Sequence, residues 1–236
     1  MAAFIGFPTK MPRLGKSNEN ASSRLDKPAP MSVIFPDTGD EKTIRQGTIV
    51  ATYITAFPPD PDSALYNVWA FVFRTKLFEV QTVQVTLEEI PRTDGHSEYS
   101  DTFIKCSSGP PLGTNGRITG MSKTFKISFR QGSTIGDFID EVVDRKLNKY
   151  QLVNGRGLLP SSTDFADFEN LLGKRYWTSR VLKDATSFFS ARDEVVTARN
   201  CLLQGWEHEF PIRPGDYVEI MKGKFFEQSQ WKITRP

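Results

Sequence analysis

Histidine and cysteine are the residue types in this chain that could perform acid–base, nucleophilic or metal chemistry, and the sequence contains two of each. His96 lies in a turn-forming segment, 94–98, and His208 lies between two glutamates. A catalytic Cys–His pair can form between residues far apart in the sequence, but no local signature accompanies Cys106 or Cys201. Two leucines follow Cys201, and an apolar environment raises the pKa of a thiol and makes it inert. We therefore predict no catalytic residue in this chain.

The two cysteines are also too few for a disulfide framework or a four-cysteine metal site. A disulfide between Cys106 and Cys201 stays open as an alternative, but two free, buried thiols are the simpler interpretation. A reducing compartment agrees with this cysteine content.

Patterns for metal, phosphate or nucleotide binding are absent from the sequence. It contains no His-x-x-x-His, no paired Cys-x-x-Cys and no calcium-loop spacing, and it lacks the glycine patterns of phosphate and dinucleotide loops. We interpret the acidic pairs Glu88–Glu89 and Asp140–Glu141 as solvated charges. The prediction is a protein that is not an enzyme and has no cofactor and no metal.

Charge is nearly balanced over the whole chain but not at its ends. The formal net charge is +2. Residues 1–30, however, carry five basic and two acidic side chains, and the last fifteen residues carry four basic side chains and one acidic side chain. Cations alternate with aromatic residues near the C-terminus, as in surfaces that combine base stacking with phosphate contacts. The candidate nucleic-acid contacts are Lys222, Lys224, Phe226, Trp231, Lys232 and Arg235.

No segment predicts insertion into a membrane. The strongest apolar run, 68–73, is far shorter than the roughly 20 residues of a spanning helix. The apolar residues at the N-terminus precede the first charges and are too short for a secretory signal. We expect an intracellular, soluble, cytoplasmic protein, or a virion component if the protein is viral.

The elements that must position any site are clearest between 123 and 150. Apolar residues alternate along 123–129 and then recur with helical spacing from Ile135, and Thr134 and Asp137 match a capping box at the change. A return strand follows at 150–153. In the first half we predict strands at 48–57, 66–76 and 80–90. Strand 66–76 is apolar on both faces and should be buried, whereas strand 80–90 should have one face in water. We expect these two strands to pair antiparallel.

The remaining segments are less regular. A long connection, 91–122, contains one short predicted strand at 102–105. One helix is predicted to begin after 161–164 and end at Gly173, and a second to cover 178–191. Segment 195–203 fits a helix or a strand, and a strand is predicted at 217–221.

These elements predict an α+β fold, in which an antiparallel β-rich body, a sandwich or a sheet, carries about three packed helices in its C-terminal half. Residues 1–45 are predicted to form an extended N-terminal arm, because they are polar and rich in turn residues. Residues 46–236 are predicted to form a single domain, and a subdivision into 46–122 and 123–236 stays open. Shared burial of the two parts is the favoured interpretation.

The order strand, helix, strand and a final strand led by Pro-Gly-Asp is similar to the ubiquitin-like β-grasp arrangement. The resemblance covers 123–221 and lacks the first β-grasp strand in its usual place. It implies a binding scaffold, hence a protein-binding adaptor, and assigns no site residue.

The arm carries apolar side chains that are costly to leave in water, and an arm can bury such anchors against another subunit. The predicted assembly contacts are Phe4, Ile5, Phe7, Ile34 and Phe35. This layout resembles that of small viral coat, matrix or occlusion proteins. We therefore predict a non-enzymatic, self-assembling structural protein whose partner is itself, as a homo-oligomer or lattice. A protein-binding adaptor and a nucleic-acid-binding protein that uses the basic termini are the alternatives.

Overall fold

The fold is given by a computed structural model of the 236-residue chain. It describes residues 33–35, 41–58, 67–77, 81–90, 99–153, 163–207, 210–211 and 224–225. The predicted strand at 217–221 lies outside this part of the chain.

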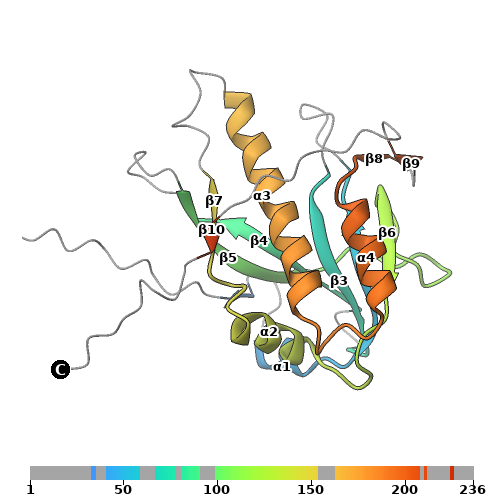
Figure 1. Ribbon diagram of the computed structural model, residues 1–236. Coiled ribbons are helices and arrows are strands. Elements are labelled where there is room, and N and C mark those ends of the chain that lie inside the picture. Colours follow the sequence, from blue (N-terminus) through green and yellow to red (C-terminus); the bar gives the residue numbers. More distant parts are fainter. Residues whose placement is uncertain are drawn as a thin grey trace, which may run out of the picture.

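A mixed sheet of eight strands forms the centre of the molecule (Figure 1). Its order is β10-β7-β5-β4-β3-β2-β6, and β1 also pairs with β5. Every pairing is antiparallel except that of β1 with β5, which is parallel. The strands are β1 (Val33–Ile34), β2 (Ile49–Ala56), β3 (Trp69–Thr75), β4 (Thr82–Glu89), β5 (Tyr99–Ser108), β6 (Lys123–Ile127), β7 (Tyr150–Val153) and β10 (Lys224–Phe225). A separate hairpin contains β8 (Trp206–Glu207) and β9 (Phe210–Pro211).

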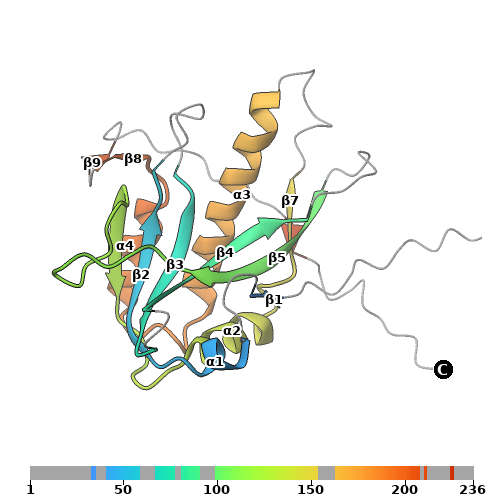
Figure 2. The ribbon, with the colours of Figure 1, turned by 180° about the vertical axis from the view of Figure 1, so that it is seen from behind.

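Helices are concentrated in the C-terminal half, which together with the sheet confirms the α+β prediction. They are α1 (Glu41–Gln46), α2 (Ile135–Asp144), α3 (Thr163–Asp184) and α4 (Arg192–Cys201). α3 and α4 cover one face of the sheet, and the view from behind shows β2 to β5 without these helices in front (Figures 1 and 2). The ambiguous segment 195–203 is therefore mainly helical.

The change from strand to helix between 123 and 150 agrees with the prediction. The Thr134 side chain accepts a hydrogen bond from the Asp137 N–H, and the Asp137 carboxylate accepts one from the Thr134 N–H. This reciprocal pair satisfies two donors that a helix start leaves without intrahelical partners. Ile135, Phe138, Ile139 and Val142 are buried, as their spacing predicts. Strands 66–76 and 80–90 also pair antiparallel as predicted.

Three local predictions are wrong. The short strand at 102–105 is the ten-residue β5, which pairs with β4, β7 and β1. The predicted wet face of strand 80–90 is partly covered, because Lys174 of α3 reaches Glu88 at 2.8 Å and Thr86 donates to the same carboxylate. Gly173 does not end a helix but lies inside α3, where an added Cβ would come within 2.6 Å of Leu152 Cδ2. Glycine thus allows α3 to lie close against β7.

The predicted second helix, 178–191, is also wrong in its bounds. It is the last part of α3, which ends at Asp184. After a few local bonds to Val181 and Ala185, the backbone pairs with the segment after β6: the Arg130 N–H donates to the Phe188 carbonyl, and the Ser190 N–H donates to the Ser128 carbonyl. Tertiary pairing therefore replaces helix continuation here.

The β-grasp resemblance is not supported by the topology. β6 pairs with β2 and β7 pairs with β5, so that β5, β4, β3 and β2 lie between them. Apart from the separate β8–β9 hairpin, the described strands of segment 123–221, β6 and β7, therefore form no sheet of their own. They lie on both sides of the strands from the first half.

One aromatic cluster joins the two halves of the chain. The Phe71 ring of β3 lies 5.1 Å from Phe138, 6.0 Å from Trp177 and 6.1 Å from Phe189, measured between ring centroids. Phe73 lies 4.7 Å from Phe138. All of these residues belong to one buried core. Buried aromatic area of this kind supplies much of the apolar stabilisation of a fold.

Candidate assembly surface

The N-terminal segment enters the sheet as β1. Val33 is paired with Ile104 and Ile34 with Lys105, in parallel register on β5. Val33 and Phe35 are half-buried and pack against the core, whereas Ile34 is 39% exposed. This alternation is that of a strand with one face on the protein and one face in water.

The C-terminal segment enters on the same side of the sheet as β10. Lys224 pairs with Gln151 and Phe225 with Tyr150 on β7, and β7 in turn pairs with the first residues of β5. Gln151 Nε2 donates to Asp101 Oδ1 at 2.7 Å across the β5–β7 pair. Strands from both ends of the chain therefore complete the sheet along β5 and β7. Two-residue strands protect little of a sheet edge from pairing with another chain.

The predicted contacts are distributed unevenly over this surface. Ile34 lies in β1 and Phe35 directly follows it, and Lys224 lies in β10. The other predicted assembly contacts, Phe4, Ile5 and Phe7, lie outside the described residues, as do Lys222, Phe226, Trp231, Lys232 and Arg235. The structure thus brings residues from both predicted contact regions to one side of the sheet.

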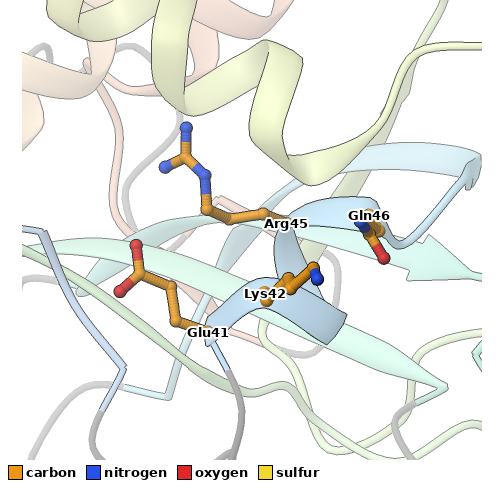
Figure 3. Close-up of a pocket in the computed structure, with 4 residues that line it drawn as sticks. All are labelled: Glu41, Lys42, Arg45 and Gln46. Atoms are coloured by element: carbon orange, nitrogen blue, oxygen red, sulfur yellow. The ribbon is translucent and has the colours of Figure 1, made fainter.

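α1 lies next to this side, although the sequence assigned most of it to the extended arm. Ile44 anchors the helix because its side chain is 1% exposed, and Arg45 forms a salt bridge with Asp140 of α2. An open depression of about 490 Å³ is lined by Glu41, Lys42, Arg45 and Gln46. Figure 3 shows Glu41 and Arg45 pointing to the same side of α1. The surface of this depression therefore carries charges of both signs.

At the opposite edge of the sheet, formed by β6, a cation lies over two aromatic rings. Lys123 of β6 places its ammonium 5.1 Å from the Phe125 ring centroid and 4.7 Å from that of Trp206, within the range of cation–π attraction. Phe210 of the neighbouring hairpin is 73% exposed. In the part of the chain that the structure describes, β6 pairs with β2 alone.

A buried polar network holds the hairpin against the body, and sequence reasoning missed it. Asn67 donates to the carbonyls of Phe57 and Trp206 at 2.8 and 2.9 Å and accepts from the Trp206 N–H at 2.7 Å. Arg175, fully buried, donates to the Leu202 carbonyl at 3.3 Å. For Asn67 the sequence shows only a polar residue next to the apolar run 68–73, and this pattern does not reveal its partners.

Comparison with known proteins gives no match. No family model, no curated protein and no solved structure matches this chain.

Two further findings concern the described residues only. None of their helices is long and apolar enough to cross a membrane. Within the same ranges no three His, Cys, Asp or Glu side chains form a group that could hold a metal ion.

Both thiols are free in the structure; Cys106 is buried as expected, whereas Cys201 is only half-buried. Burial raises the pKa of Cys106 to about 12, an effect that Arg45 opposes and Glu41 reinforces. Burial also raises the pKa of Cys201 to about 11, against the opposing charge of Lys123. At neutral pH both side chains are therefore protonated thiols in the folded chain.

These shifts predict slow alkylation of the native protein. At about pH 8 we expect both thiols to react with iodoacetamide about a hundred-fold or more slowly than in the unfolded chain, whose cysteines titrate near 8.5. The pKa of each thiol is higher in the folded chain than in the unfolded chain, so keeping the thiols protonated contributes to the stability of the fold. That contribution is complete below about pH 8.5 and falls as the pH rises toward 11–12. Mass spectrometry of the native and denaturant-unfolded chain measures the rates. Equal rates would contradict the burial of these thiols.

Proposed function

We propose that this chain is a non-enzymatic structural protein that assembles with copies of itself through the β1, β5 and β10 side of its sheet. The observation that supports the proposal is that segments from both chain ends add short strands to this one side, β1 on β5 and β10 on β7. A terminal segment held by a two-residue strand can contact a neighbouring copy while few contacts within its own chain are lost.

The chemistry of the same side favours a protein partner over a small molecule. Val33 and Phe35 pack against the core while Ile34 remains exposed, so the edge presents apolar surface beside backbone groups. When a strand is added to a sheet edge, main-chain hydrogen bonds provide the affinity, and contacts of every second side chain provide the specificity. Charges of both signs on α1 complete a surface that a second copy can complement.

A pair of matched substitutions tests the proposal. Ile34→Lys replaces exposed apolar surface of β1 by a cation, and a contact with a second copy would have to remove that charge from water. We expect this variant to dissociate more readily, with a dissociation constant raised several-fold. Val196→Lys is the control, because Val196 is 45% exposed on α4, far from β1.

Analytical ultracentrifugation of both variants and the unchanged chain measures the effect. The expected result is weaker association for Ile34→Lys alone. Equal behaviour of the two variants would place the interface elsewhere and overturn the role of this surface.

A further inference from the structure

We infer that the chain binds single-stranded nucleic acid beside β6, on the face of the sheet opposite α3 and α4. The binding surface, called the β6 platform, consists of one aromatic ring and three cations: Tyr53, Arg74, Arg117 and Lys126. It lies near the opposite edge of the sheet from β1 and β10, so this inference goes beyond the proposed function and does not depend on self-assembly.

The strand register places the ring and two of the cations on one face of the sheet. Tyr53 of β2 is directly opposite Lys126 of β6, and Arg74 of β3 is opposite Ala51, two positions before Tyr53. Adjacent residues of a strand point to opposite faces. Phe73, the neighbour of Arg74, packs into the aromatic core under the helices. Tyr53 and the two cations therefore belong to the other face, which Figure 2 shows from the front.

The connection between β5 and β6 adds the third cation. Gly116 lies against the guanidinium of Arg74, because a Cβ at this position would be 3.4 Å from Arg74 Nη1. Its φ of 68° is one that glycine adopts without strain. The side chain of Asn115 accepts a hydrogen bond from the Arg117 N–H at 3.0 Å, which fixes the turn, and Arg117 is exposed. Arg117 therefore lies next to Arg74, although the two are far apart in the sequence.

Charge is segregated on this side of the molecule. The whole chain has 30 basic and 28 acidic side chains, but residues 102–136 contain five basic side chains and no acidic one. β2 and β3 contain no acidic residue either. Glu194 of α4 reaches the segment after β6, but its carboxylate accepts hydrogen bonds from the N–H and the hydroxyl of Ser128, at 2.5 and 3.1 Å. A surface with cations and no acidic residues attracts a polyanion.

Protection of the sheet edge does not account for this arrangement. Lysine at an edge discourages pairing with another chain, but this role concerns only Lys126. Arg74 lies in β3, between β2 and β4, where no edge needs protection. Its side chain is half-buried, and no cation of the β6 platform forms an ion pair with a described residue. A half-buried guanidinium loses part of its hydration, and an anionic ligand replaces that interaction.

The ring distinguishes nucleic acid from other polyanions. Tyr53 is half-buried, and within the described part of the chain its side chain makes no hydrogen bond and no ring contact. A ring between cations on the two neighbouring strands offers a base a surface for stacking and offers the adjacent phosphates opposite charges. An acidic peptide needs the cations but not the ring. The bases of a duplex are already stacked on each other, so the ligand is a single strand.

Fluorescence anisotropy of a fluorescein-labelled oligouridine strand, titrated with the full-length chain at several salt concentrations, tests the charges. Lys126→Gln combined with Arg117→Gln removes two phosphate contacts, so the slope of log affinity against log salt should decrease by about 1.4. Lys146→Gln combined with Lys183→Gln is the matched control, because both residues are exposed and belong to the helical part, Lys183 in α3 and Lys146 after α2. This control should keep the slope of the unchanged chain.

A second pair of variants tests the ring. Tyr53→Leu removes the stacking surface and should weaken binding about ten-fold, whereas Tyr53→Phe keeps the ring and should bind as the unchanged chain does. Circular dichroism verifies that all variants are folded. Competition with polyglutamate, which has charge but no bases, completes the experiment.

The outcomes decide between nucleic acid and other ligands. A smaller salt slope for the Lys126 and Arg117 pair alone, together with binding that requires the Tyr53 ring, supports the inference. Absence of binding at low salt, or equal slopes for the two charge pairs, overturns it. Equal binding by Tyr53→Leu and Tyr53→Phe, or displacement of the strand by polyglutamate at the same concentration as by unlabelled oligouridine, also overturns it and indicates an acidic protein as the ligand.

Discussion

Replacing Phe71 by alanine is expected to lower the free energy of unfolding by about 3–5 kcal/mol. The Phe71 side chain is fully buried, and its ring contacts Phe138, Trp177 and Phe189 from the second half of the chain. The loss has two sources, the transfer free energy of the ring and the cavity that remains among rigidly packed neighbours. A single domain typically has about 5–15 kcal/mol of stability, so this change removes a large fraction of it.

The same variant tests whether the two halves share one core. Because Phe71 lies in the first half and its ring partners lie in the second, both halves should unfold in one transition, before and after the substitution. Urea unfolding followed by tryptophan fluorescence and by far-UV circular dichroism measures this. Phe210→Ala is the control, because a side chain that is 73% exposed should change stability by no more than about 0.5 kcal/mol. Two separate transitions, or a loss below about 1 kcal/mol for Phe71→Ala, would contradict a shared core.

Deleting residues 1–40 is expected to reduce self-association at least about ten-fold, which corresponds to about 1.4 kcal/mol. The deletion removes β1 and with it Val33 and Phe35, which pack against the core, but it leaves α1 intact. Burial of Ile34, the exposed apolar residue of β1, against a second copy would contribute an amount of this order, because full burial of such a side chain is worth about 1.5–3 kcal/mol. Sedimentation velocity measures association, and circular dichroism verifies that the shortened chain is folded.

A shorter deletion separates the two groups of predicted contacts in the arm. Removing residues 1–30 eliminates Phe4, Ile5 and Phe7 but retains β1, so part of the association should persist. If both shortened chains associate as strongly as the intact one, the arm does not form the interface.

The comparison between sequence and structure shows which features were local enough to predict. The capping box of Thr134 and Asp137 was recognisable because both partners lie within one helical turn. The buried strand β3 was recognisable because both of its faces are apolar. In both cases the determining residues lie within a few positions of each other.

Features that depend on distant partners were not predictable. Gly173 has the sequence signature of a helix end, and only the approach of Leu152 from β7 explains why a glycine stands inside α3. The full length of β5 follows from its pairing with three other strands. Some of the partners of β5 are far away in the sequence. Asp101 of β5 and Gln151 of β7, for example, are 50 positions apart.

The candidate site shows the same division. Apolar side chains within a polar segment predict Ile34 and Phe35 as contacts, and this signal is local. Their pairing partners on β5, and the placement of β10 on the same side, required the sheet order. Asn67 and Arg175 gave no usable signal, since their partners are backbone groups at Phe57, Leu202 and Trp206.

The central claim is that the chain assembles with itself, and the absolute mass of the intact protein tests it most directly. Light scattering coupled to size exclusion, repeated over a wide range of concentrations, should give a mass above the 26.7 kDa of one chain, rising with concentration or constant at a closed multiple. A mass of 26.7 kDa at every concentration would contradict the account.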